Sequence, residues 1–207
     1  MSFKKNKYIV VKKVLSKEFC RYLYNYSIIK RDFFREISRK KNIYKTNIHL
    51  GKFGDVQIPG SNTYSCYGDI AMETLLLKMQ NVIEKKTKLK LVPTYSYNRL
   101  YVKGDELKKH VDRDSCEISA TIFYGGEKWP IYIGNKKIES DYGDMILYRG
   151  TEVSHFRKPL KVGQSSHVFL HYNDVNGPFK ETNKFDGRFF IGAPKLVDTE
   201  FSLEVNS

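Results

Sequence analysis

The sequence is poor in cysteine and histidine and has no long apolar run. Its 207 residues include three cysteines, Cys20, Cys66 and Cys116, which lie far apart and form no Cys-x-x-Cys pair. We therefore expect neither a zinc–cysteine site nor a disulfide framework, and reduced thiols instead. No apolar run reaches the length of a membrane span, and the N-terminus lacks the pattern of a secretory signal peptide.

Charge of one sign dominates, because the formal net charge is +13. The lysines are spread along the whole chain, which favours an ordinary solvated surface over a dedicated polyanion-binding block. A nucleic-acid partner is possible but not favoured, and no membrane partner is expected. The abundance of Lys, Asn, Ile and Tyr is typical of an AT-rich genome. We expect a cytoplasmic protein of a bacterial cell or a virus-infected host.

The first part of the chain, residues 1–90, is expected to supply one strand and two supporting helices. Residues 7–14 have the composition of a strand, and Ser16 is a candidate cap for the helix that follows. Asp69 is a candidate cap for a second helix with an apolar stripe. Between the helices, residues 39–66 are polar and contain Gly and Pro, which predicts a long loop with room for a short strand.

From residue 91 the apolar residues alternate with polar ones, as in strands. Short strands then continue to residue 174, including a hairpin that turns at Gly134-Asn135. Residues 175–207 have weak periodicity and are expected to form a C-terminal extension. The sequence therefore predicts a single domain over 1–207, mainly β with N-terminal helices (α+β), built on a β-sandwich or jelly roll.

Two residues on one predicted strand have the chemistry of a metal site. His110 and Asp112 are two positions apart in the stretch "YVKGDELKKHVDRD", so their side chains point to one face. A mononuclear non-haem iron centre needs two imidazoles and one carboxylate, with open positions left for other ligands. The third ligand would come from a later strand, where His155 is a candidate. Asp114 offers a competing spacing with His110.

The fuller pattern extends these two residues to Tyr101-x-x-Gly104-x5-His110-x-Asp112, followed by "GDMILYRGTEVSHF". Over residues 92–174 this resembles the Fe(II)/2-oxoglutarate-dependent dioxygenases, in their prolyl 4-hydroxylase-like branch. The resemblance implies a double-stranded β-helix of the cupin-like type. It also implies that His110, Asp112 and His155 bind Fe(II), and that 2-oxoglutarate and O2 are cosubstrates. It further implies that Tyr101 and Tyr124 hydrogen-bond 2-oxoglutarate.

The sequence departs from this pattern where a cation is expected. The family usually has Arg or Lys nine or ten residues after the second histidine, and this residue binds the distal carboxylate of 2-oxoglutarate. Here the two positions are occupied by Gln164 and Ser165. A buried dicarboxylate needs a cation. We expect Arg157, which is two residues after His155, or Arg99 to replace it, with Arg157 ranked first.

The resemblance implies hydroxylation of a C–H bond, with a prolyl residue of a protein or peptide as the first substrate and a free amino acid or other small molecule as the second. Two alternatives stay open. A nucleic-acid-directed oxidative demethylase would need a basic, aromatic groove for a flipped base. A non-catalytic β-helix binding module would explain the missing cation at Gln164.

Overall fold

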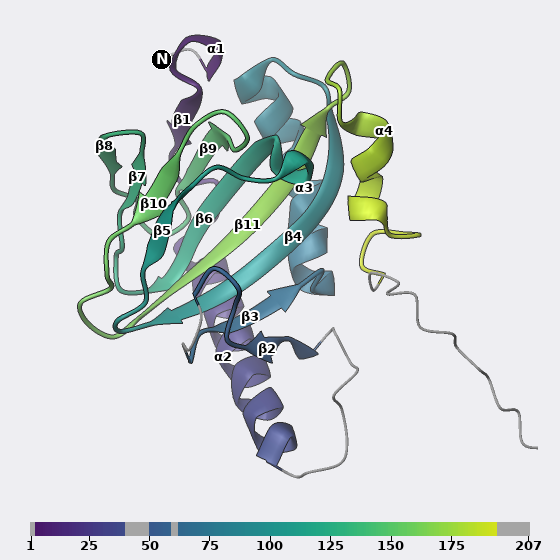
Figure 1. The fold of residues 1–207 in the computed structure, drawn as a ribbon. Coiled ribbons are helices and arrows are strands. Elements are labelled where there is room, and N and C mark those ends of the chain that lie inside the picture. Colours follow the sequence, from purple (N-terminus) through teal and green to yellow (C-terminus); the bar gives the residue numbers. More distant parts are fainter. Residues whose placement is uncertain (1–2, 40–49, 59–61, 194–207) are drawn as a thin grey trace, which may run out of the picture.

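A computed structural model describes residues 3–39, 50–58 and 62–193, and its frame is a seven-stranded antiparallel sheet (Figure 1). In spatial order its strands are β1 (Tyr8–Val11), β9 (Met145–Arg149), β6 (Ile118–Gly126), β11 (Gln164–Asp174), β4 (Leu91–Val102), β3 (Tyr64–Tyr67) and β2 (Lys52–Phe53). β4 and β11 pair along almost their whole length and form the centre of the sheet.

A smaller antiparallel sheet lies in front of the larger one in Figure 1. Its order is β5 (Leu107–His110), β10 (His155–Arg157), β7 (Ile131–Ile133) and β8 (Lys136–Ile138). β7 and β8 form the hairpin predicted at Gly134-Asn135, where Gly134 has a φ of 57°. The two facing sheets confirm the expected mainly β fold with a double-stranded β-helix core.

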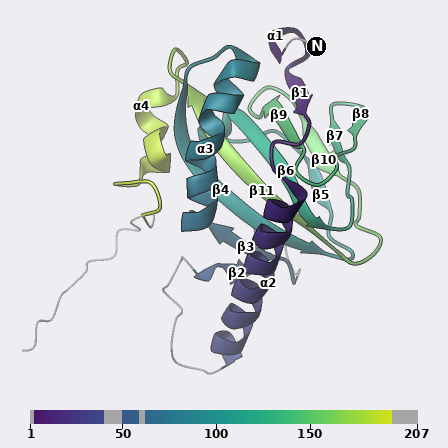
Figure 2. The same ribbon diagram turned by 180° about the vertical axis from the view of Figure 1, so that it is seen from behind.

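Helices α2 (Lys17–Arg39) and α3 (Ile70–Thr87) cover the other face of the larger sheet (Figure 2). Both begin at the predicted caps. The Ser16 hydroxyl accepts from the Phe19 amide at 3.1 Å, and Asp69 accepts from the Met72 amide at 3.1 Å. These contacts satisfy amides that have no partner within the helix. None of the helices in the described ranges is long and apolar enough to cross a bilayer.

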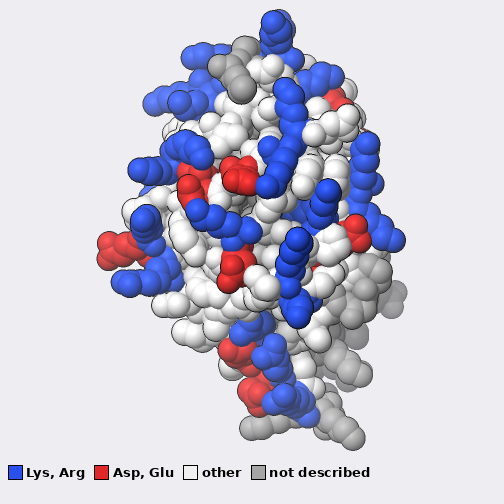
Figure 3. Space-filling view, turned by 90° about the vertical axis from the view of Figure 1, so that its left-hand side faces the viewer, with Lys and Arg blue, Asp and Glu red and all other residues white. Residues whose placement is uncertain are grey.

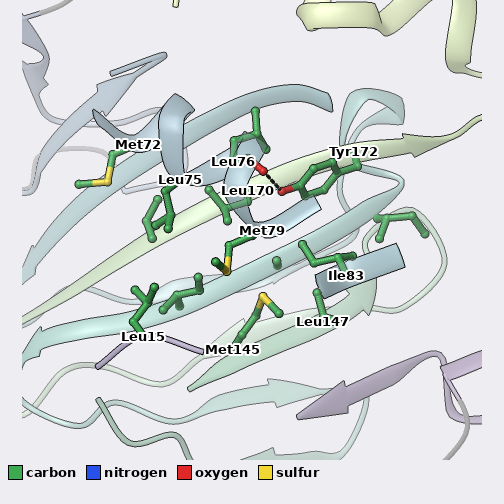
Figure 4. Packing of buried hydrophobic residues seen from close by; sticks show 14 of the residues in the cluster. Leu15, Met72, Leu75, Leu76, Met79, Ile83, Met145, Leu147, Leu170 and Tyr172 are labelled. Atoms are coloured by element: carbon green, nitrogen blue, oxygen red, sulfur yellow. Dashed lines mark hydrogen bonds between the residues drawn. The ribbon is translucent and has the colours of Figure 1, made fainter. Parts of the chain in front are cut away.

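The main core lies between these helices and the larger sheet (Figure 4). Met72, Leu76 and Met79 of α3 pack against Leu170 and Tyr172 of β11, and the Tyr172 hydroxyl donates to the Leu76 carbonyl at 2.6 Å. Because side chains alternate along a strand, the intervening residues of β11 face the smaller sheet instead. The apolar core thus fixes which side chains of β11 reach the space between the sheets.

Residues 39–66 were expected to form a long loop with one short strand. The described parts instead supply two strands, β2 and β3, which extend the larger sheet beyond β4. Residues 40–49, which include His49, and 59–61 lie outside the described residues. The pairing of β3 with β4 brings this segment next to the strand that carries Tyr101, and it therefore contributes to the space between the sheets.

The short elements at the two ends are α1 (Phe3–Asn6), α4 (Lys180–Asn183) and the 3-10 helix η3 (Lys184–Gly187). Two ion pairs, one buried and one partly exposed, hold the C-terminal segment on the rest of the domain. Arg188 pairs with Glu73 of α3 at 2.9 Å, and Asp186 pairs with Arg113 at 2.8 Å. The predicted extension therefore packs on the core as far as residue 193, and its remaining residues lie outside the described part.

Candidate metal centre

The structure brings His110, Asp112 and His155 together. β5 and β10 are adjacent strands, and their register places His155 directly opposite His110. The Asp112 Oδ1 atom lies 3.4 Å from His155 Nε2 and 3.6 Å from His110 Nε2. One ligand atom from each residue lies within 4.8 Å of the others. The neighbouring strand thus supplies the third ligand that the sequence pattern requires.

Backbone carbonyls orient both imidazole rings. His110 Nδ1 lies 2.7 Å from the Lys108 carbonyl, and His155 Nδ1 lies 3.1 Å from the Val153 carbonyl. A carbonyl only accepts, so each Nδ1 carries the proton and each Nε2 presents its lone pair beside Asp112. This arrangement is typical of metal-binding histidines. The donor set of two imidazole nitrogens and one carboxylate therefore fits a divalent iron.

The Asp112 carboxylate is held in its ionised form. Burial alone would raise the pKa of Asp112, but contacts with His110 and His155 hold it well below its usual range. Burial likewise opposes protonation of His110, but its contact with Asp112 raises the pKa of His110 above the ordinary value. The three side chains thus attract positive charge, which is the electrostatic condition for a cation site.

A second set of possible ligands shares Asp112 and adds Cys116 and His171. Burial raises the pKa of the Cys116 thiol, and the Tyr95 hydroxyl lies 3.1 Å from its sulfur. Thiolate, not thiol, binds metals. His171 Nδ1 also lies 3.0 Å from the Ser119 hydroxyl. This set is therefore less suited to a metal than the two histidines with Asp112.

A cavity of about 670 Å³ opens onto the three residues from between the two sheets. Its walls are rich in aromatic rings, namely Tyr67, Tyr95, Tyr97, Tyr148 and Phe169. Tyr67 and Tyr95 stack with their ring centroids 5.0 Å apart. Sequence reasoning did not assign these residues to the site. Alternation along β4 and β11 was the available signal for Tyr95, Tyr97 and Phe169.

Arg99 lines the cavity, but a carboxylate already neutralises it. Its guanidinium lies 2.9 Å from Asp55 and donates to the Gln57 side-chain oxygen at 2.7 Å. The Gln57 amide nitrogen in turn lies 3.3 Å from His110 Nε2. The segment around Gln57 thus covers the metal-facing nitrogen of His110. No sequence signal singled it out.

Arg157 lies behind the cavity and is 1% exposed. It donates to the Trp129 carbonyl and lies 3.4 Å from His167 Nδ1, and its Nε has no hydrogen-bond partner among the described residues. None of the carboxylates in the described ranges pairs with it. Burial lowers the pKa of Arg157 to about 10. Tyr101, whose ring centroid is 4.8 Å from that of Trp129, is buried in the same cluster.

Tyr124, which was expected to bind 2-oxoglutarate, and Gln164, which stands where the cation is missing, both lie on the helix-covered face of the larger sheet. Tyr124 contacts the Asn98 side-chain oxygen at 2.5 Å and Ser27 of α2 at 3.0 Å. Gln164 accepts from Arg31 of α2 at 2.9 Å. Both side chains therefore contact α2, which contradicts the expected contact of Tyr124 with 2-oxoglutarate.

No protein-family model matches the sequence, and no curated protein is similar to it in sequence. Solved structures do match its fold. A viral collagen prolyl hydroxylase from Paramecium Bursaria Chlorella virus-1 has a TM-score of 0.57 and 16% identity, covering 83% of this chain and 98% of its own. A prolyl-4-hydroxylase from Pseudomonas putida has a TM-score of 0.56 and 15% identity, covering 84% and 96%.

A third match is the non-heme alpha-ketoglutarate-dependent epimerase SnoN from nogalamycin biosynthesis, with a TM-score of 0.60 and 12% identity over 95% of this chain and 93% of its own. These proteins catalyse different reactions, so the likeness extends to architecture and not to substrate. The chain has the jelly-roll fold of the Fe(II)/2-oxoglutarate-dependent oxygenases.

Proposed function

We propose that the protein is an Fe(II)- and 2-oxoglutarate-dependent oxygenase that hydroxylates a C–H bond. The observation that carries this proposal is the arrangement of His110, Asp112 and His155, in which the Nε2 atoms of both histidines lie 3.6 and 3.4 Å from one carboxylate oxygen. When bound, iron and 2-oxoglutarate supply the activation of O2. The chain supplies three ligands, a cavity that holds the substrate beside them, and walls that limit the access of water.

Arg157 is the proposed anchor for the distal carboxylate of 2-oxoglutarate. It follows His155 by two residues on β10, so the two side chains share a face and their Cα atoms are about 7 Å apart. A buried guanidinium with an unpaired donor favours a bidentate carboxylate. Arg99 is less suited, because it already pairs with Asp55. The Tyr101 hydroxyl accepts a hydrogen bond from Arg99 at 3.1 Å and is the proposed hydroxyl partner of the cosubstrate.

The proposed substrate is a prolyl residue of a protein or peptide, with a small amino acid as the second candidate. Support comes from the aromatic walls of the cavity, since aromatic faces pack well against apolar rings. Two of the similar structures are prolyl hydroxylases. A direct test is the release of succinate from 2-oxoglutarate with proline-rich peptides, with matched peptides in which alanine replaces proline, and with free amino acids. The proposed substrate requires succinate release that depends on the prolyl residue.

The deciding experiment is an anaerobic titration with Fe(II) and 2-oxoglutarate, monitored by the visible metal-to-ligand charge-transfer band. We expect the band in the wild-type protein and its loss in His155→Ala. Lys109→Ala is the matched control, because this exposed residue is on the strand that ends at His110. Iron binding without the band would show that the iron-loaded protein does not bind 2-oxoglutarate, and would contradict the proposed cosubstrate. No iron binding at all would favour the non-catalytic binding module.

A further inference from the structure

The two oxygens of the Asp112 carboxylate have different surroundings. Oδ1 faces the Nε2 atoms of His110 and His155 at 3.6 and 3.4 Å. Oδ2 accepts a hydrogen bond from the Ser119 hydroxyl at 2.8 Å. The Asp112 amide also donates to the Gly150 carbonyl at 2.8 Å, which fixes the backbone of this residue. One oxygen is therefore turned toward the metal site and the other toward β6.

The Ser119 hydroxyl connects Asp112 to His171. It lies 3.0 Å from His171 Nδ1 and 3.0 Å from the Cys116 carbonyl as well as 2.8 Å from Asp112 Oδ2. A hydroxyl has a single proton, and the ionised carboxylate is the strongest acceptor of the three. Ser119 therefore donates to Asp112 and accepts from His171, which places a proton on His171 Nδ1.

Ser119 and His171 are held in place by the sheet and by aromatic rings. Ser119 of β6 and His171 of β11 are directly paired in the sheet, and both are buried. The His171 ring is packed between Tyr95, at a centroid distance of 4.6 Å, and Phe169, which is parallel to it within 3°. The main apolar core behind β11 fixes the position of this strand. The orientation of Asp112 thus depends on two residues that are not among the three proposed metal ligands.

We propose that Ser119 and His171 are positioning residues that hold the Asp112 carboxylate with Oδ1 turned toward the metal site. This inference rests on the proposed function, which assigns a metal to His110, Asp112 and His155. A carboxylate without such partners has to be ordered when the metal binds, which weakens binding. The hydrogen bond from Ser119 to Oδ2 fixes the carboxylate in advance and leaves Oδ1 facing the two histidines.

Manganese(II) binding to the full-length protein, measured from the electron paramagnetic resonance of the free ion, tests this proposal without turnover. Ser119→Ala and His171→Phe are expected to weaken Mn(II) binding about 10- to 100-fold, as for other residues that orient metal ligands. His171→Asn retains an amide donor and is expected to recover most of the affinity. Ser166→Ala is the matched control, because the Ser166 hydroxyl is buried and has no partner among the described residues.

The outcomes separate this inference from the proposed function. A wild-type protein that binds no Mn(II) would overturn the proposed metal site itself. Wild-type affinity in Ser119→Ala and His171→Phe would leave the metal site intact and overturn the positioning role. Equal loss in His171→Asn and His171→Phe, at unchanged thermal stability of the metal-free proteins, would show that the donated proton is not what matters and would also overturn it.

Discussion

Arg157 and Arg99 are both buried guanidinium groups, and their partners distinguish them. Arg99 has Asp55, whereas the polar partners of Arg157 within the described part of the chain are a carbonyl and an imidazole. We therefore expect Arg157→Gln to weaken 2-oxoglutarate binding about 10- to 100-fold, the effect of losing charged hydrogen bonds worth about 1.5 to 3 kcal/mol. Titration of the charge-transfer band measures this. Arg157→Lys keeps the charge and should have an intermediate affinity. An unchanged affinity in both variants would exclude Arg157 as the anchor.

Gly150 leaves the space in which the Asp112 carboxylate sits. A Cβ atom at this position would collide with Asp112 Oδ2 and the Cys116 carbonyl, and would lie 2.9 Å from the Ser119 hydroxyl. Gly150→Ala should destabilise the fold by about 1 to 3 kcal/mol and displace the carboxylate. Urea unfolding and Mn(II) binding measure the two effects. Gly134→Ala, where no atom lies within 4 Å, is the control and should keep its metal affinity.

Individual residues could be predicted only where local spacing decides their direction. His110 and Asp112 were expected on one face of a strand, and they do lie close together, but β5 ends at His110 and Asp112 follows it outside the strand. Tyr124 is different, because its expected role came from the resemblance and not from spacing. Ile118, Ala120 and Ile122 lie in the core under the helices, and Tyr124 continues the same alternation along β6 into that core. The alternation of β6 was therefore the local signal that Tyr124 faces the helices.

At the scale of elements, η3 is held to the sheet by the Asp186 carboxylate. Burial alone would raise the pKa of Asp186, but hydrogen bonds from Arg113, Tyr67 and Ser115 lower it to about 2. The ionised form is therefore favoured in the folded state. Its contribution to stability is present above about pH 4 and is lost as the pH falls from about 4 to about 2.

We expect Asp186→Asn to be less stable than the wild type by about 1 to 2 kcal/mol at pH 7, a value reduced for the partial exposure of Arg113. Near pH 2 the difference between the two free energies of unfolding should become small, because the wild-type carboxyl is then becoming protonated. Chemical unfolding at both pH values measures the difference. A constant difference across this range would contradict the assignment to the Asp186 charge.

Helices and caps were predictable because their signals are local. Ser16 and Asp69 each bond an amide three residues ahead, and a reader of the sequence sees both partners together. The joining of β2 and β3 to β4 depends on pairing between segments more than thirty residues apart, as between Tyr64 and Leu100. Such pairing is decided by the packing of the whole sheet, which is why residues 39–66 appeared to be a loop.

At the scale of the whole molecule, the large net positive charge raises the question of a polyanionic partner. On the face drawn in Figure 3, Lys and Arg side chains are scattered and Asp and Glu lie among them. This agrees with the even spread of lysines along the sequence. The face in view has no continuous basic stripe of the kind that a nucleic-acid groove requires. The charge therefore gives no support to the demethylase alternative on this face.

Ligand binding should stabilise the entire fold, because the metal would join β10 to the residues at and just after the end of β5. At ligand concentrations about 100 times the dissociation constant, the gain is about 2.7 kcal/mol, which corresponds to about 5 to 10 °C in Tm for a chain of this size. Thermal unfolding with and without Mn(II) and 2-oxoglutarate measures it. His155→Ala should show no such shift, and an equal shift in that variant would place the binding elsewhere.

The amide of Gln57 occupies the lone pair of His110 Nε2 that a metal needs. A cation at this nitrogen would repel the amide hydrogens, so Gln57 must turn away whenever the metal binds. Gln57 belongs to the turn formed by residues 55–58. Its side chain also accepts a hydrogen bond from Arg99, and an ion pair joins Asp55, at the start of this turn, to Arg99. Loading the metal would thus loosen one of the contacts that fasten this turn. Faster backbone hydrogen exchange over residues 55–58 would then report an occupied site.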